Sequence, residues 1–207
     1  MEIARAAAGL FVRQGLRATR AEDIAQAAGI APRTFYRYFA TKEEAVAPLY
    51  AAGAQRWTEA VAAAPAGLSL PQALEHALRH TLTPGAGVSA ASWELVRTLI
   101  RLTDTSPALG KVWAEVCHTS EGRLAEVLTE RGADGAADNV GKETAVDPEQ
   151  ASALRFAAAV AGAAVRVAVE SWAADTKPAS GPKGPAALAL RNLAALRDFP
   201  WTDLVGA

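Results

Sequence analysis

Few residues of this chain suit metal, redox or covalent chemistry. Among 207 residues there are one cysteine, one methionine and three histidines. A single cysteine cannot form an internal disulfide, and it excludes a Cys-rich zinc module. Lys and Arg (21) nearly balance Asp and Glu (22), so any nucleic-acid site must be a local patch rather than a polycationic chain.

Long apolar runs are also missing. No run reaches the ~18 residues that a membrane-spanning helix requires, so no such helix is expected. The first ten residues lack a charged start followed by a long apolar stretch, which argues against a secretory signal. A soluble cytoplasmic protein is therefore expected.

Alanine dominates what is present. It occurs 51 times, and hydrophobic residues make up 51% of the chain, so a sizeable core can be buried. Alanine is the best helix former, and strand-forming residues are sparse. The composition therefore predicts an all-α protein.

Caps, prolines and apolar spacing predict nine helices. Thr19 and Glu22, and then Thr41 and Glu44, have the spacing of capping boxes that begin the second and fourth helices. Residues 132–146 are expected to form a loop, and residues 176–185 a linker. The expected helices are 3–14, 20–28, 32–38, 42–63, 70–82, 90–103, 107–131, 148–174 and 186–197.

The first three helices are short, and a glycine-containing turn joins the second to the third. This arrangement is typical of a helix-turn-helix unit. Phe35 and Phe39 are four residues apart and would anchor the third helix in the core. Its other side chains include arginine and tyrosine, which suit phosphate oxygens and guanine edges. A merely solvated surface would have the same composition.

Residues 15–43, which run from Gly15 through Ile24-Ala25 and Thr34-Phe35-Tyr36 to Lys42-Glu43, resemble the DNA-binding segment of TetR-type bacterial transcriptional repressors. The resemblance extends over about residues 3–47. It implies a nine-helix chain with a DNA-binding domain at 1–47 and a ligand-binding and dimerisation domain at 48–207. It also implies a homodimer that binds a palindromic operator and is released by a small molecule.

The resemblance assigns roles to individual residues. Thr19 and Lys42 would contact phosphate, and Tyr38, at a position usually held by histidine, would contact the DNA backbone. Arg33 and Arg37 are the candidates for reading guanine. Ala31 departs from the family because it replaces a serine cap, and no basic arm precedes the first helix. The expected DNA-binding residues are Thr19, Arg20, Arg33, Thr34, Tyr36, Arg37, Tyr38 and Lys42.

The eighth helix has two apolar faces, which indicates that it lies between its own domain and something else. The resemblance implies a partner subunit, and a central helix of a monomeric bundle is the alternative. Pro48 is expected in the interior of the fourth helix, where a proline tends to kink the helix. Pro48 and Gly53 are therefore the expected hinge. The expected interface residues are Val160, Ala163, Val167, Leu190 and Leu193.

A ligand pocket is expected among the apolar faces of the C-terminal helices, for an effector that is largely apolar. Ordinary core packing is the alternative for each residue. Cys117 is expected to be an inert buried thiol. The expected lining residues are Trp93, Thr103, Trp113, Cys117, Ser120, Phe156 and Trp172.

Two other functions are compatible with the same sequence. A DNA-binding regulator without a ligand fits the same residues, and a helical enzyme is the third candidate. No nucleophile–base pair, phosphate loop or metal motif supports an enzyme. His76 and His80 have helical metal-ligand spacing but lack a third ligand, so neither a metal nor a cofactor is expected.

Overall fold

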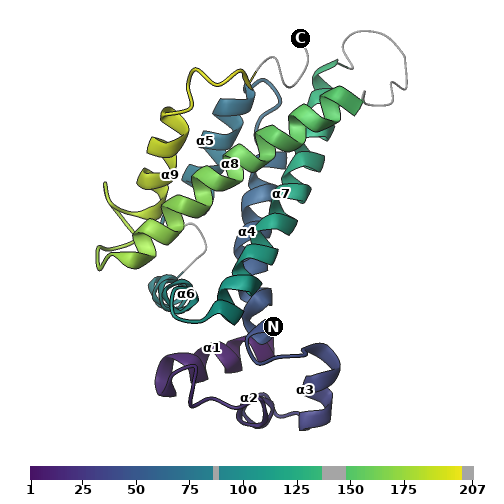
Figure 1. Cartoon of the computed structure of the whole chain (residues 1–207). Helices are drawn as coiled ribbons and strands as arrows, with labels where there is room; N and C mark the ends of the chain where they lie inside the picture. The colour runs from purple at the N-terminus through teal and green to yellow at the C-terminus, as the bar shows by residue number, and fades with distance from the viewer. Residues whose placement is uncertain (86–88, 137–147, 202–207) are drawn as a thin grey trace. The chain divides into compact units, whose positions relative to one another are not determined.

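The structure is a computed structural model that describes residues 1–85, 89–136 and 148–201, with only the backbone of 133–136. Within these residues the chain forms nine α-helices and one 3-10 turn, and no strand occurs among them (Figure 1). The predicted all-α class is confirmed. The elements are α1 (Glu2–Gln14), α2 (Ala21–Ala27), α3 (Pro32–Tyr38), η1 (Glu44–Val46), α4 (Ala47–Ala62), α5 (Leu70–Thr81), α6 (Ala90–Thr103), α7 (Pro107–Ala136), α8 (Pro148–Ala174) and α9 (Pro185–Ala194).

The chain divides into two compact units. Unit 1 comprises Met1–Ala54 with Val88–Val116, and unit 2 comprises Gln55–Gly87 with Cys117–Ala207. The helices α4 and α7 each contribute one segment to each unit. These packing units differ from the predicted division at residue 47, and the assignment of separate functions to 1–47 and 48–207 stays a prediction.

In unit 1, α1 packs against α2, η1 and α6. Its alanines Ala7 and Ala8 are fully buried, and small side chains allow this close approach of helices. The hydroxyl of Tyr50 in α4 donates a hydrogen bond of 3.0 Å to the carbonyl of Leu99 in α6. The tyrosine hydroxyl thereby finds a partner in the buried core, as a buried polar group must.

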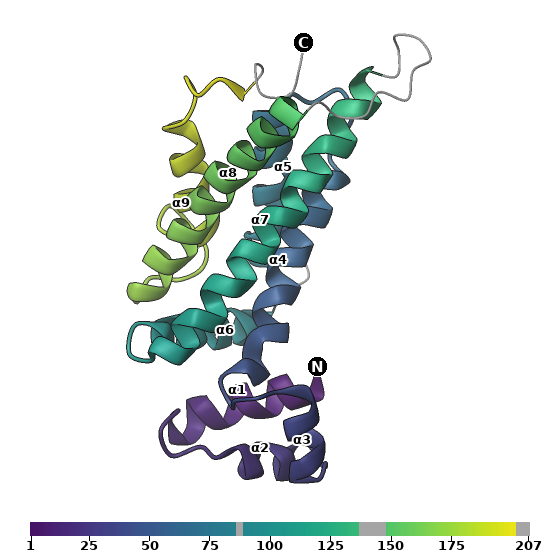
Figure 2. The ribbon, with the colours of Figure 1, turned by 45° about the vertical axis from the view of Figure 1, so that its right-hand side comes forward.

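In unit 2, α8 and α9 lie side by side (Figure 2). The Asn192 side chain donates a hydrogen bond of 2.8 Å to the carbonyl of Ala164, which fixes α9 on α8. The turn before α9 is tight, because a Cβ at Gly184 would overlap the carbonyl oxygen of Ala179. The core around this pair includes Leu74, Leu78, Leu124, Leu128, Leu154, Ala157, Ala161 and Leu193.

Three expected helix boundaries are wrong. The fourth helix begins at Ala47 after the 3-10 turn, so Pro48 lies in the first turn of α4 and not in its interior. A first-turn proline gives up no intrahelical hydrogen bond. The seventh helix continues beyond 131 to Ala136, and the ninth ends at Ala194 rather than 197. The remainder of the expected loop 132–146 lies outside the described residues.

The helix α8 is long and apolar enough to satisfy a membrane-span criterion of length and composition. Nine of its residues, among them Leu154, Ala161 and Trp172, are buried by the rest of the protein. One such helix is weak evidence of a membrane span, because the core helix of a soluble protein passes the same test.

Candidate nucleic-acid interface

The turn between α2 and α3 is set by Gly29. Its φ of 67° lies in the left-handed region, which favours glycine. The next amide, that of Ile30, donates a hydrogen bond of 2.9 Å to the carbonyl of Ala25 and so closes the end of α2. Pro32 then begins α3, where its missing N–H costs nothing. The chain is thus redirected within four residues.

A single side chain anchors α3. Phe35 is completely buried, and its ring centroid lies 5.5 Å from that of Phe39 and 5.5 Å from that of Tyr36. The other side chains of the helix are exposed or half-buried. Burying Phe35 therefore turns Arg33, Tyr36 and Arg37 toward solvent.

The exposed face of α3 carries both aromatic and cationic side chains. Tyr36 and Tyr38 are 52% and 60% exposed. The Tyr36 hydroxyl donates a hydrogen bond of 3.3 Å to Glu22 of α2. The Arg37 guanidinium donates to the Tyr38 hydroxyl at 3.2 Å and lies 5.0 Å from the centre of its ring. These guanidinium and hydroxyl groups can bond phosphate oxygens and base edges.

The start of α2 differs from the prediction. Thr19 is 1% exposed and its hydroxyl donates a hydrogen bond of 2.8 Å to the carbonyl of Gly15, so the Thr19–Glu22 capping box is wrong. Arg20 is the residue before the helix, and its N–H donates to the Asp23 carboxylate at 2.9 Å. The Arg20 side chain is 75% exposed and lies 3.4 Å from Glu22. Exposure therefore favours Arg20 over Thr19 as a phosphate ligand.

Lys42 also has unexpected partners. Its ammonium donates hydrogen bonds of 2.7 Å to the carbonyl of Leu16 and 2.8 Å to that of Thr19. The side chain therefore turns inward, to the turn before α2, and is half-buried. These acceptors lie 26 and 23 residues earlier in the chain, so no local sequence pattern indicates them. The same holds for the Glu22–Tyr36 bond.

Comparison with known proteins identifies the chain. Residues 3–47 match the model of the bacterial regulatory proteins of the tetR family. The chain is 31% identical over 173 residues to the HTH-type transcriptional regulator TcmR of Streptomyces glaucescens, which covers 83% of this chain and 71% of TcmR. The chain belongs to the tetR family. It is a DNA-binding transcriptional regulator, as the resemblance implied.

Solved tetR-family structures share the fold. The repressor FadR of Thermus thermophilus, in complex with lauroyl-CoA, has a TM-score of 0.56 and 23% identity, over 94% of this chain and 91% of that one. The repressor AlkX of Dietzia sp. strain DQ12-45-1b, implicated in n-alkane biodegradation, has a TM-score of 0.57 and 20% identity, over 99% and 96%.

The expected pocket residues of this tetR-family chain belong to both units, so their joint lining of a cavity stays a prediction. In unit 1, Trp93 is buried, and the Thr103 hydroxyl donates to Ile100 of its own helix at 2.6 Å. The half-buried Trp113 ring lies 5.1 Å from that of Tyr50. These contacts are those of ordinary helix packing.

In unit 2, Trp172 is fully buried, and Cys117 and Ser120 are half-buried. Burial raises the pKa of the Cys117 thiol to about 12, with Arg166 opposing this and Glu170 and Glu121 adding to it. Phe156 is 57% exposed and packs on Phe199 at 5.6 Å. Its placement as an interior pocket wall is wrong, because it lies on the outer face of α8.

Four of the five expected interface residues retain exposed or half-buried side chains. Val167 is 45% exposed, and Val160, Ala163 and Leu190 are half-buried. Leu193 is only 7% exposed and lies in the core of its own unit, so it offers little surface to a partner. The hinge at Pro48 and Gly53 remains a prediction, although its premise of an interior proline is wrong.

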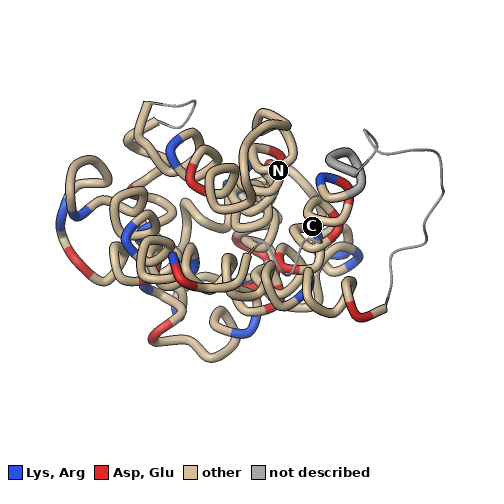
Figure 3. Tube along the Cα trace, turned by 90° about the horizontal axis from the view of Figure 1, so that it is seen from above, with Lys and Arg blue, Asp and Glu red and all other residues tan. Residues whose placement is uncertain are grey.

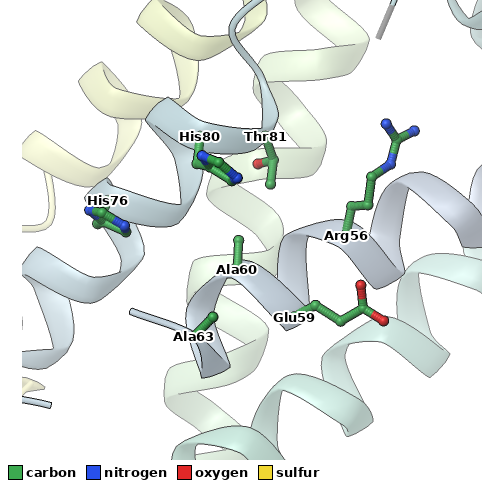
Figure 4. A pocket seen from close by; sticks show the side chains of 7 residues that line it. All are labelled: Arg56, Glu59, Ala60, Ala63, His76, His80 and Thr81. Carbon is green, nitrogen blue, oxygen red and sulfur yellow. The ribbon is translucent and has the colours of Figure 1, made fainter. Parts of the chain in front are cut away.

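One open groove of about 420 Å³ lies between α4 and α5. His76, His80 and Thr81 line it from α5, opposite Ala60 and Ala63, while Arg56 and Glu59 extend away from His76 (Figure 4). Among the described residues no three His, Cys, Asp or Glu side chains are close enough to hold a metal ion. The groove residues therefore do not converge on a common point.

Charges of both signs are interspersed along the described trace (Figure 3). The near-neutral chain thus has to bind DNA through a few placed cations rather than through an overall field. Arg20, Arg33 and Arg37 are exposed cations of the helix-turn-helix segment, and their contact with DNA stays a prediction.

Proposed function

We propose that this tetR-family chain is a cytoplasmic repressor that binds a palindromic operator as a homodimer and releases it when a largely apolar small molecule binds. The exposed face of α3 is the observation that supports operator binding most directly. It presents Arg33, Tyr36 and Arg37 on a helix fixed by the buried Phe35. A helix of this kind enters the major groove, where arginine bonds guanine in two places.

The outer face of α8 supports the homodimer. Phe156 and Val167 are large apolar side chains more than two-fifths exposed, and the half-buried Val160 and Ala163 continue the same face. Contiguous apolar surface of this kind marks an interaction site, and two-fold dimers are the commonest oligomers. A dimer would present two recognition helices to two half-sites related by the same symmetry.

Release by a small molecule follows from family behaviour. The fold accommodates an organic ligand in the FadR structure with lauroyl-CoA. A ligand changes operator affinity only if it binds the DNA-competent and released states differently. The apolar side chains of α6, α7 and α8 support an apolar effector for this chain.

The test is selection of genomic DNA fragments by the purified protein, followed by a salt titration on the most enriched fragment. We expect one palindromic sequence to be enriched, with affinity falling steeply as salt rises. Binding without sequence preference by protein free of co-purified small molecules would contradict the proposal. Mass spectrometry of the denatured protein supplies that control.

The same fragment separates the two alternatives from the proposal. A ligand-independent regulator would keep its operator affinity in the presence of every compound screened. An enzyme would convert a bound compound, so its mass would change on incubation. We expect instead a compound that leaves the protein unaltered and weakens operator binding.

A further inference from the structure

Lys42 connects two segments of unit 1 that are distant in sequence. It follows α3, in the segment that leads into η1 and α4. Its ammonium donates to the carbonyls of Leu16 and Thr19, in the turn between α1 and α2. Both distances, 2.7 and 2.8 Å, are those of strong charge-assisted hydrogen bonds.

That turn determines where α2 begins. Gly15 leaves α1 with a φ of 85°, and the Thr19 hydroxyl donates back to the Gly15 carbonyl at 2.8 Å. Arg20 follows at once, with its amide held by Asp23 and its side chain exposed. Any shift of the turn therefore moves Arg20 and the start of α2.

An ammonium group has three donors and no acceptor. Two of the Lys42 donors are used by carbonyls of the free protein, and the side chain is half-buried around them. To bind a phosphate as its main partner, Lys42 would have to give up bonds to a turn that nearby DNA-binding groups depend on.

We propose that Lys42 is a positioning residue. It holds the α1–α2 turn against the segment before α4, and it places Arg20 and α2 for DNA before any DNA is present. This rests on the DNA-binding function of the chain. It departs from the phosphate-ligand role that the family resemblance implied for Lys42.

The first test uses the wild-type protein without DNA. Lysine amines are labelled with an acylating reagent, and rates at Lys42 and Lys111 are compared by mass spectrometry. Lys111 also lies in unit 1, and its side chain is 78% exposed. Lys42 should react slower by about tenfold or more, because its hydrogen bonds must open first. Equal rates, or protection of Lys42 only after DNA is added, would overturn the proposal.

The second test compares Lys42→Met with Arg20→Met. Two probes are used, the fragment selected from the genome and a random-sequence duplex of the same length. Losing one phosphate contact lowers the slope of log affinity against log salt by about 1. Arg20→Met should show this loss. Lys42→Met should lower the affinity for the selected fragment by about tenfold or more. Added to Arg20→Met, it should lower the slope no further, because the phosphate contact that it disturbs is that of Arg20.

Two further variants keep this comparison decisive. Lys42→Arg retains donors for the carbonyls and should recover most of the affinity. Thr19→Val removes the other bond that holds the turn, so it should couple to Lys42→Met in a double-mutant cycle on affinity. A further slope loss of about 1 when Lys42→Met is added to Arg20→Met, or additive effects of Lys42→Met and Thr19→Val, would indicate a phosphate ligand. A lower unfolding temperature with unchanged affinity would indicate a purely structural role.

The outcomes also separate this proposal from the operator hypothesis. If the wild-type chain selects no fragment, the labelling result and the random-duplex slopes still decide the role of Lys42. If it selects one and Lys42 reacts as fast as Lys111, the operator hypothesis stands and the positioning role fails.

Discussion

Two helices, one in each unit, have exposed faces of different chemistry. The helix α3 in unit 1 buries one large side chain and exposes arginine and tyrosine. The helix α8 in unit 2 buries nine residues and still exposes Phe156 and Val167. An exposed polar face suits a charged polymer, whereas an exposed apolar face suits a second protein surface. The contrast predicts that changes on the two faces impair DNA binding and dimerisation separately.

The largest effect is expected from Phe35→Ala. Removing a fully buried phenylalanine costs about 3–5 kcal/mol, and here it removes the anchor of a seven-residue helix. DNA binding should be lost, while the dimer persists because α8 is untouched. Gel-shift and sedimentation measurements check both parts. Tyr36→Phe is the control, since it removes one exposed hydroxyl and should keep the fold. If Phe35→Ala bound DNA with wild-type affinity, α3 would not be the DNA-binding face.

The reciprocal change is Val167→Asp on α8. A charge in the middle of an apolar interface should weaken the dimer by about 100-fold or more. The isolated protomer should unfold at the same temperature, because the Val167 side chain is 45% exposed. Sedimentation equilibrium measures the first effect and calorimetry the second. Arg155→Asp places the same group outside that face and should leave the dimer intact. A monomeric wild-type protein would remove the basis for this prediction.

A smaller effect is expected from Arg131→Met. In unit 2 the Arg131 guanidinium donates to the carbonyls of Ala64 at 2.6 Å and Pro65 at 3.0 Å, just after α4 ends. Losing these charge-assisted bonds should cost about 1–2 kcal/mol of unfolding free energy, measured with urea. Operator affinity should be unchanged where both proteins are folded, unlike in Lys42→Met. Arg123→Met, which removes an exposed ion pair with Glu126, is the control and should change neither quantity.

Local patterns in the sequence predicted the features that interactions between neighbouring residues determine. Gly29, Pro32 and Phe35 determine the turn and the anchored helix, and each acts within a few residues. The capping box was misplaced by one residue, because Thr19 bonds backward to Gly15 and leaves Asp23 to hold the amide of Arg20. The sequence is compatible with a Thr19–Glu22 capping box and with the observed Arg20–Asp23 bond, so packing decides between them.

Longer-range choices could not be predicted. The inward turn of Lys42 depends on carbonyls more than 20 residues away. Phe156 was expected to line an apolar pocket, but its side chain is 57% exposed and packs on Phe199, 43 residues further along the chain. Pro48 fits an interior position or a first turn equally well until the 3-10 turn at Glu44–Val46 delays the start of α4. The deciding partners of Lys42 lie far along the chain, whereas the turn that decides the place of Pro48 ends only two residues before it.

The last prediction concerns Cys117, whose ionisation does not affect stability at neutral pH, and it tests whether water reaches this thiol between α7 and α8 in unit 2. Burial raises the pKa of this thiol from 9.0 to about 12, and it does so although Arg166 acts in the opposite direction. At neutral pH the thiol should stay protonated, so native protein should react with iodoacetamide far more slowly than unfolded protein. Rapid alkylation of the native protein at pH 8 would show that water reaches the thiol.

The same shift sets the direction of a pH dependence. The folded state prefers the neutral thiol, so its contribution to stability is complete below pH 9, where the unfolded thiol is also neutral. Above pH 9 the unfolded thiol ionises and the folded one does not, so this contribution is lost as the pH rises toward 12. The free energy of unfolding, measured with urea, should therefore depend on pH in the same way for wild type and Cys117→Ala up to pH 9. Above pH 9 the wild type should lose more stability than the variant. Parallel curves across the whole alkaline range would mean that the thiol is as solvated in the folded protein as in the unfolded chain.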